Sequence, residues 1–270
     1  MTHLYQVSTF RAQQLQRLRN VTIHSPSIIQ IISGSKRLFQ SDGAIALSST
    51  KLLLCEGSSR FSFENLPEQG AFLSRMFSFH SPAKQDLIQL SQQNMRAEDL
   101  PWIEKEKAIE QTLNVLYSLD LSHMSTDTQH LWLAPLYQQL AERGVLHHLF
   151  INQQASFREQ LTRYLSLSPS EVHSLEEVAS HFAISRATCL RRLKKEGLQY
   201  REVLSDVRLN HALSLMQAQS WSVLQLAYMC GYKSEQRFSQ RFRSKFGLTP
   251  TDYMRTIRSN AEPSQSLVEH

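Results

Sequence analysis

Hydrogen-bonding side chains fill the gaps between regularly spaced phenylalanines in residues 231–250. The stretch holds five basic residues and one acidic residue. Phe238, Phe242 and Phe246 lie on one stripe of an α-helix, because positions i, i+4 and i+8 share a face. Amide and guanidinium groups can hydrogen-bond the edges of planar partner groups, and guanidinium groups also neutralise anions. The polar residues on the opposite face of the helix are Glu235, Gln236, Ser239, Gln240 and Arg243.

The plain alternative for this segment is a solvated surface helix. A solvated helix usually carries mixed charge and Glu–Lys pairs, whereas here acids are nearly absent and amides occupy the middle of the face. Ser234 is a natural N-cap and Gly247 a natural stop for the helix. The pattern therefore favours a helix that offers its outer face to a partner.

Positive charge is concentrated in the C-terminal third of the 270-residue chain. Residues 185–260 contain 14 Lys and Arg against 5 Asp and Glu, while the remainder contains 15 against 19. A basic third on a slightly acidic body indicates a polyanionic partner for that third.

The same third of the chain repeats itself. Five consecutive cap and core positions recur 48 residues later, and the second copy ends, like the first, at a glycine. The first copy has Ser174, Leu175, Val178, Ala179 and Phe182, and the second has Ser222, Val223, Leu226, Ala227 and Cys230. The stop glycines are Gly197 and Gly247.

Each copy is predicted to form a helix, a tight turn and a second helix. Ser174-x-x-Glu177 and Ser222-x-x-Gln225 are both capping boxes, and the second helices begin at Ser185 and Ser234. This is helix-turn-helix geometry, in which the second helix enters a DNA major groove. Residues 200–217 form a connecting helix of about 27 Å, which suits two units reading grooves about 34 Å apart.

The C-terminal third resembles the AraC/XylS transcriptional regulators over residues 165–258, and its short first unit resembles the enteric virulence and acid-resistance branch. The residues that carry the resemblance are Leu175, Val178, Ala179, Ser185, Gly197, Arg208, Leu209, Ala212, Leu215, Leu226, Ala227, Gly231, Tyr232, Phe238, Ser239, Arg241, Phe242, Phe246, Gly247, Pro250 and Tyr253.

The resemblance implies base contacts on the outer faces of both second helices. These are Ala187, Leu190 and Arg191 in the first unit, and Glu235, Gln236, Ser239 and Gln240 in the second. Arg binds guanine edges and Gln binds adenine edges bidentately. Other basic residues are predicted phosphate contacts, which position without specifying sequence: Arg186, Arg192, Lys194, Lys233, Arg237, Arg243 and Lys245.

The N-terminal half reads as strands followed by helices. Short β-rich segments fill residues 21–79, with turns at residues 41–43 and 67–70. Helices are expected at 83–93, 103–120, 127–141 and 144–165. The resemblance implies a cupin-like antiparallel β domain whose helices dimerise. One of two helices with apolar stripes is expected to form the dimer contact, and the alternative is that both helices pack on the β domain. The stripes are Ile109, Leu113, Leu116 and Leu119 in one helix, and Leu131, Trp132, Leu136 and Leu140 in the other.

The competing class is a cupin-type enzyme or small-molecule-binding protein with an accessory nucleic-acid-binding domain. His24 and His80 are isolated and are interpreted as surface or turn histidines, so neither a metal nor a cofactor is predicted. No catalytic residues are predicted. A ligand cavity and a packed core both remain open for the apolar residues of the β region, which are Ile29, Ile31, Phe39, Leu47, Phe61, Phe77 and Phe79.

Lys36 and Arg37 are the candidates for holding an anionic effector. Some relatives in the resembled family bind fatty acids between their two domains. A sensor of such a ligand and a ligand-free activator are both compatible with the sequence.

The sequence thus predicts an α+β chain, with a β/α domain over 1–165, a double helix-turn-helix domain over 166–260 and a disordered tail over 261–270. No apolar run approaches the ~20 residues that span a bilayer, and the three scattered cysteines favour a reducing cytoplasm. The predicted function is a homodimeric regulator of transcription that binds double-stranded DNA. Activation through RNA polymerase follows from the resemblance alone.

Overall fold

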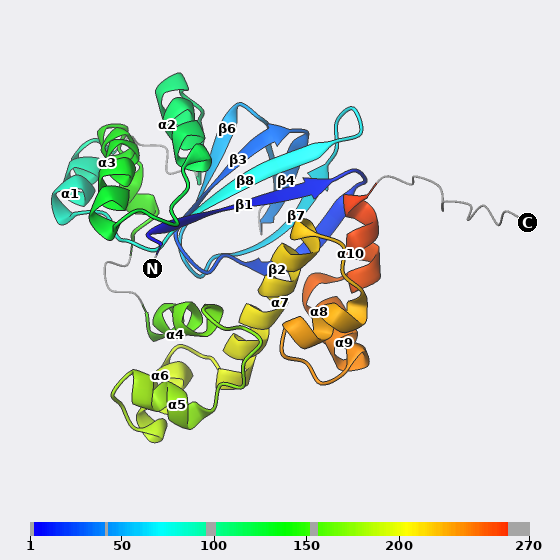
Figure 1. Ribbon diagram of the computed structural model, residues 1–270. Helices are drawn as coiled ribbons and strands as arrows, with labels where there is room; N and C mark the ends of the chain where they lie inside the picture. The colour runs from blue at the N-terminus through cyan, green and yellow to red at the C-terminus, as the bar shows by residue number, and fades with distance from the viewer. Residues whose placement is uncertain (1–2, 41–42, 96–100, 152–155, 259–270) are drawn as a thin grey trace, which may run out of the picture.

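The computed structural model describes residues 3–40, 43–95, 101–151 and 156–258. An antiparallel β part with three helices at one end is followed by a helical C-terminal part (Figure 1). The predicted disordered tail over 261–270, and Ser41 and Asp42 of the first predicted turn, lie outside the described residues.

Two antiparallel sheets form the N-terminal part. One has the strand order β1-β8-β3-β6-β9 and the other β2-β7-β4-β5. The strands are β1 (Tyr5–Ala12), β2 (Gln16–Thr22), β3 (Ser27–Ser33), β4 (Ser35–Gln40), β5 (Gly43–Leu47), β6 (Lys51–Cys55), β7 (Arg60–Leu66), β8 (Phe72–Phe79) and β9 (Trp102–Glu104). The six strands predicted between residues 27 and 79 are confirmed as β3 to β8.

The sequence prediction missed β1 and β2. β1 pairs with β8 along its full length, and β2 pairs with β7. Neither segment alternates cleanly between apolar and polar residues, and β2 carries two arginines and an asparagine in seven residues. Pairing with a neighbouring strand, rather than local pattern, makes these segments extended.

The apolar residues of the β region divide between two cores instead of lining one interior. Ile31 and Leu47 belong to a cluster between the sheets. Phe77 and Phe79 pack with Leu113 and Leu136 of the helices on the other face of the five-stranded sheet. Phe39 is 39% exposed. Of the two alternatives left open for these residues, the packed core describes the buried ones, and Phe39, Phe77 and Phe79 do not line the space between the sheets.

Helices α1 (Gln85–Gln93), α2 (Lys107–Ser118) and α3 (Thr126–Glu142) confirm three predicted helices in type and approximate place. The second was predicted to begin at residue 103, which instead pairs with β6 as part of β9. The predicted helix over 144–165 is not continuous. A 3-10 turn covers Leu146–His148, and α4 covers Phe157–Ser166.

The predicted pair of helix-turn-helix units is confirmed in the C-terminal part. The helices are α5 (Leu175–His181), α6 (Arg186–Lys195), α7 (Tyr200–Ala218), α8 (Val223–Met229), α9 (Glu235–Phe246) and α10 (Pro250–Ile257). Ser174 and Ser222 close capping boxes with Glu177 and Gln225. Gly247 ends α9 at φ +90°, in the left-handed region that glycine adopts without strain.

Helix α4 packs with the first helix-turn-helix unit. Its Phe157, Leu161 and Leu165 share a core with Val178 and Cys189, among other residues of that unit. We propose that the C-terminal domain begins at α4, before the expected boundary at residue 165.

The β part also shares a core with the second unit. Leu18 and Val21 of β2 join the cluster that contains Phe238 and Phe242 of α9, and α7, α9 and α10 contact β1 or β2 (Figure 1). Gln217 of α7 accepts a hydrogen bond from the backbone amide of Arg11 and donates one to its carbonyl, at 2.9 and 3.0 Å. The sheet therefore fixes one side of the second unit.

Candidate nucleic-acid interface

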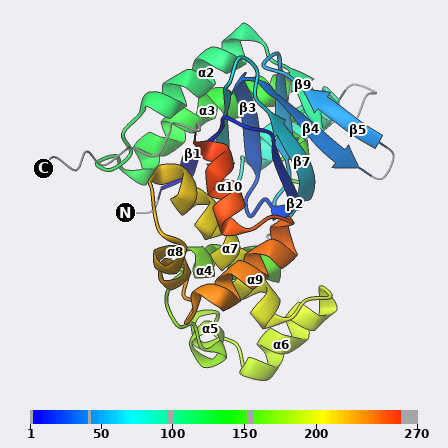
Figure 2. The ribbon, with the colours of Figure 1, turned by 90° about the vertical axis from the view of Figure 1, so that its right-hand side faces the viewer.

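The second helix of each unit exposes the face that the sequence predicts for base contacts. Figure 2 shows α6 and α9 along the lower part of the molecule. On α6 the exposed side chains are Ala187, Leu190 and Arg191, and on α9 they are Glu235, Gln236 and Gln240, with Ser239 partly exposed. The structure thus leaves these side chains free to meet a partner.

The aromatic stripe of α9 explains why this face points outward. Phe238, Phe242 and Phe246 are completely buried. The ring centroid of Phe242 lies 5.8 Å from that of Phe238, 4.7 Å from that of Phe246 and 6.1 Å from that of Tyr253. Aromatic pairs at these separations are mutually stabilising, and the helix cannot rotate without exposing them.

Six of the seven predicted phosphate contacts are exposed: Arg186, Arg192, Lys194, Lys233, Arg237 and Arg243. Arg186 pairs with Glu176 at 2.7 Å, but both side chains are 63% exposed, so the pair is weak. Arg192 lies 5.5 Å from the ring centroid of Phe157. These six basic residues are therefore accessible from solvent.

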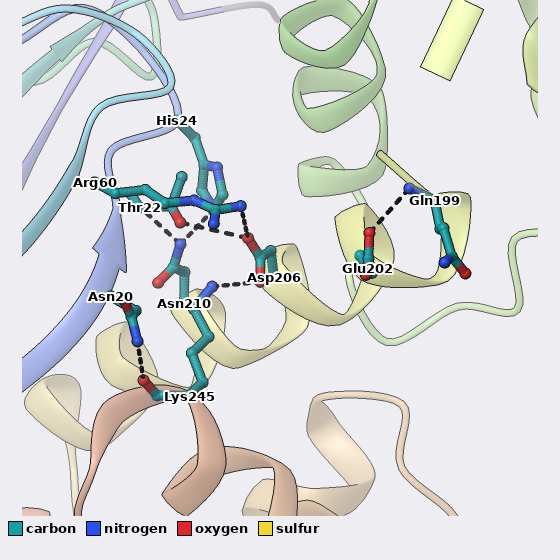
Figure 3. A network of polar contacts seen from close by, with 9 residues as sticks. All are labelled: Asn20, Thr22, His24, Arg60, Gln199, Glu202, Asp206, Asn210 and Lys245. Atoms are coloured by element: carbon teal, nitrogen blue, oxygen red, sulfur yellow. Dashed lines mark hydrogen bonds and ion pairs between the residues drawn. The ribbon is translucent and has the colours of Figure 1, made fainter. Parts of the chain in front are cut away.

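Lys245 was predicted as the seventh phosphate contact, and its position contradicts this. Its side chain is only 10% exposed, and its Nζ lies 2.6 Å from the Asp206 carboxylate on α7. Asn20 of β2 donates a hydrogen bond to the Lys245 carbonyl oxygen. Burial lowers the pKa of Lys245, and Asp206 opposes that shift. Lys245 is therefore held at the junction between the two parts of the chain (Figure 3).

The same junction holds His24, which was interpreted as a surface or turn histidine. Its ring meets the Asn210 amide, which also donates to the Thr22 carbonyl oxygen (Figure 3). Burial and the nearby Lys245 cation lower the pKa of His24 to about 3. Asp206 further accepts from Thr22 and pairs with Arg60 at 3.7 Å. His24 is thus a neutral member of a polar network that crosses the junction.

Lys36 and Arg37 do not form a common anion site, because neighbouring residues of a strand point to opposite faces. Lys36 is 4% exposed and donates to Asn65, with its Nζ 3.5 Å above the centre of the Phe63 ring. Burial lowers the pKa of Lys36 to about 7. Arg37 is half exposed and pairs with Glu64. A head group therefore cannot contact both.

Sequence reasoning missed Arg19, which lies beside the outer face of α9. An open hollow of about 620 Å³ is lined by Arg19, Ser239, Gln240, Arg243, Ser244, Gly247 and Thr249. Because β2 itself was not recognised as a strand, nothing in the sequence connected residue 19 to a helix more than two hundred positions later.

The geometry defines a class of protein, namely one that carries a double helix-turn-helix domain on a β-sheet domain. Residues 178–256 match the family model described as "Helix-turn-helix domain". The urease operon transcriptional activator of Escherichia coli is 26% identical over 132 residues, which cover 49% of this chain and 44% of that protein. This alignment thus spans less than half of the relative's length.

Two known proteins, one matched by sequence and one by structure, are similar to this chain over most of their length. The HTH-type transcriptional regulator GadX of Escherichia coli K12 is 21% identical over 248 residues, covering 89% of this chain and 88% of that protein. The structure of fatty acid-bound ToxT from Vibrio cholerae superposes with a TM-score of 0.61 at 16% identity, covering 96% of this chain and 98% of that one. The C-terminal part of the chain is thus similar to the helix-turn-helix domain of AraC/XylS transcription regulators, and the chain as a whole has a ToxT-like fold.

The matched relatives are transcription regulators rather than enzymes, in agreement with the predicted regulator. Within the described ranges, no three His, Cys, Asp or Glu side chains are grouped to hold a metal ion. No helix in the described part of the chain has the length and apolarity to cross a membrane.

Proposed function

We propose that this protein activates transcription by binding double-stranded DNA through α6 and α9. The observation that carries the proposal is the repeated unit, in which each second helix exposes a face that includes arginine or glutamine side chains. Helix α7 has 19 residues and spans about 28 Å. Together with the width of the units, this length suits two successive major grooves about 34 Å apart.

In this proposal the exposed residues fall into base contacts and phosphate contacts, as in other DNA-binding proteins. The base contacts are Ala187, Leu190, Arg191, Glu235, Gln236, Ser239 and Gln240. The phosphate contacts are Arg186, Arg192, Lys194, Lys233, Arg237 and Arg243, and Lys245 is no longer among them. Phosphate contacts supply affinity for any duplex, while base contacts supply the preference for one sequence.

Replacing Gln236 or Gln240 by alanine is expected to weaken binding to a cognate site by about 1–3 kcal/mol. Both side chains are exposed and face away from the aromatic stripe, so folding should stay intact. Affinity for scrambled DNA should scarcely change. The measurement is affinity for cognate and scrambled duplexes on each variant, with thermal melting as the check of folding.

Lys233→Ala is the matched control, because Lys233 is exposed and is assigned to phosphate. This variant should weaken binding to the cognate and scrambled duplexes equally, and it should reduce the slope of log K against log salt by about 0.9. If both glutamine variants bind the cognate duplex as tightly as the wild-type protein does, this face of α9 does not read bases.

The protein is further proposed to act as a homodimer through α3. Ile109, Leu113 and Leu116, as well as Leu136 and Leu140, are buried in the chain's own core and are removed from the predicted contact set. Leu131 is 73% exposed and Trp132 40% exposed on the same helix. These two large apolar side chains, exposed on one helix, are the basis for placing self-association there.

Leu131→Glu is expected to shift the full-length protein from dimer to monomer in sedimentation at about 10 µM (a concentration that populates weak dimers). Val172→Glu is the control, because Val172 is 84% exposed elsewhere on the chain. A wild-type protein that sediments as a monomer contradicts the proposal, as does a Leu131→Glu variant that stays dimeric.

A small anionic molecule is proposed to modulate the protein by binding at the junction between its two parts. The protein is proposed to act in the cytoplasm. ToxT, which shares the fold, binds an unsaturated fatty acid. Here Arg60, Arg158 and Asp206 line a void of about 10 Å³, room for about one water, so an effector must open the junction. Transcription by RNA polymerase in vitro, from a promoter found by genomic binding-site sequencing, tests both parts. If the amount of transcript does not change when the protein is added, activation is contradicted. If it does not change when an unsaturated fatty acid is added with the protein, modulation by that class of ligand is contradicted.

A further inference from the structure

A bulge in β2 directs Arg19 and Asn20 toward the end of α9. The pairing of β2 with β7 shifts between Leu18 and Val21, so two residues face the single Ser62 of the partner strand. Asn20 adopts φ +53°, a left-handed conformation that only a few residue types tolerate. Bulges re-aim side chains and are frequent beside functional sites.

The two bulge residues contact α9 differently. Asn20 donates a hydrogen bond to the Lys245 carbonyl oxygen at 3.3 Å, which ties the bulge to the last turn of the helix. Arg19 lies directly over Gly247, where an added Cβ would come within 2.5 Å of the arginine Nε. The absence of a side chain at Gly247 therefore leaves room for the guanidinium at the edge of the hollow.

Arg19 has the exposure and the lack of a carboxylate partner that are expected of an anion-binding arginine. It is exposed, and among the described residues no carboxylate pairs with it. Arg17, two residues earlier in the same strand, is instead bound to Glu64. The described lining of the hollow contains the guanidinium groups of Arg19 and Arg243 and no carboxylate.

The hollow lies on the face of α9 that is assigned to DNA, because Ser239 and Gln240 form part of its lining. A duplex whose base edges meet Gln240 brings its sugar–phosphate backbone to the rim, where Arg19 and Arg243 stand. We infer that Arg19 of the β domain is a phosphate contact, so that the N-terminal domain takes part directly in binding DNA. This inference rests on the proposed function.

The simpler role for Arg19 is to stabilise the end of α9. A cation near the C-terminus of a helix interacts favourably with the helix dipole. That role predicts a lower melting temperature for an Arg19 variant and leaves the salt dependence of DNA binding unchanged. The two roles therefore differ in a measurable quantity.

The test measures the affinity of the full-length protein for a pool of random-sequence duplexes between about 50 and 200 mM salt, a range over which counterion release is large. Arg19→Ala should bind more weakly at low salt and reduce the slope of log K against log salt by about 0.9. The affinity ratio of wild type to variant should then shrink about 3.5-fold across that range. Arg19→Lys should keep the wild-type slope, because it keeps the charge.

Arg17→Ala is the matched control, since it removes an exposed arginine of the same strand that is already paired, and its slope should match the wild type. An Arg19→Ala variant with the wild-type slope overturns the inference, whether or not its melting temperature falls. Tighter binding by that variant also overturns it, because Arg19 would then obstruct DNA. If the wild-type protein itself binds no duplex, the proposed function fails, which is a distinct result.

Discussion

Phe242→Ala is expected to destabilise the second helix-turn-helix unit by about 3–5 kcal/mol, the usual effect of emptying a buried aromatic site. The Phe242 ring is completely buried among Phe238, Phe246 and Tyr253. Its cluster also includes Leu18 and Val21 of β2, so the loss extends to the contact between the sheet and the second unit. A typical domain has a total stability of only about 5–15 kcal/mol.

The effect on DNA should differ in kind from that of the glutamine variants. A melted second unit loses base and phosphate contacts together, so affinity for cognate and random duplexes should fall in parallel. Thermal melting and both affinities, measured on one preparation, check this. Tyr228→Ala is the control: it removes an aromatic ring that is 59% exposed in the same unit, and surface changes usually stay within about 0.5 kcal/mol. A Phe242→Ala protein that melts like wild type contradicts the assigned packing.

The helix-turn-helix units could be predicted from the sequence because their determinants are local. A serine cap, a glutamate or glutamine three residues later and a glycine stop each satisfy backbone groups of the same helix end. The capping boxes at Ser174 and Ser222 and the stop at Gly247 are therefore legible without tertiary information. Burial of the phenylalanine stripe follows from spacing alone.

The features that escaped prediction depend on partners far along the chain. β2 becomes a strand because β7 pairs with it and α9 packs on it, and its own seven residues favour no strand. Lys245 was expected in solvent because it sits among basic residues of a polar helix. Its real environment is set by Asp206 and by Asn20, 225 positions away.

Arg37 and Lys36 illustrate the same limit within one strand. Alternation places them on opposite faces, but the sequence does not say which face is covered by the second sheet. Lys36 faces the interior, near Phe63 and Cys55, where apolar side chains would be expected. The burial of Lys36 therefore depends on how the two sheets pack together, which the local sequence pattern does not reveal.

Lys36 should make the stability of the protein depend on pH above neutrality. Burial lowers its pKa from 10.5 to about 7, and a tenfold change in proton affinity corresponds to about 1.4 kcal/mol. The Asn65 oxygen and the Phe63 ring favour the ammonium form, but loss of hydration outweighs them. Keeping the ammonium buried below pH 7 therefore costs about 5 kcal/mol relative to pH 10.5.

The sign follows from proton binding. Between pH 7 and 10.5 the unfolded chain keeps the Lys36 proton while the folded chain releases it, so stability rises with pH. The expected contribution of Lys36 is about 1.4 kcal/mol per pH unit from pH 7 to 9. Denaturant unfolding of wild type and Lys36→Met between pH 6 and 9 measures it, since methionine keeps the aliphatic chain and does not titrate.

The difference between the two proteins isolates Lys36 from all groups that the two proteins share, including Lys245, whose pKa burial also lowers. Cys55, which faces Lys36, stays protonated in the folded protein because burial raises its pKa to about 12. Lys36→Met leaves the Asn65 oxygen without this hydrogen bond, which costs about 1–3 kcal/mol of stability. That cost is independent of pH. The variant should accordingly be the more stable protein at pH 6, and its advantage should decline toward pH 9. A difference that stays constant across the range means that Lys36 remains charged throughout, and the interior position would then be sustained by its hydrogen bond and the aromatic rings.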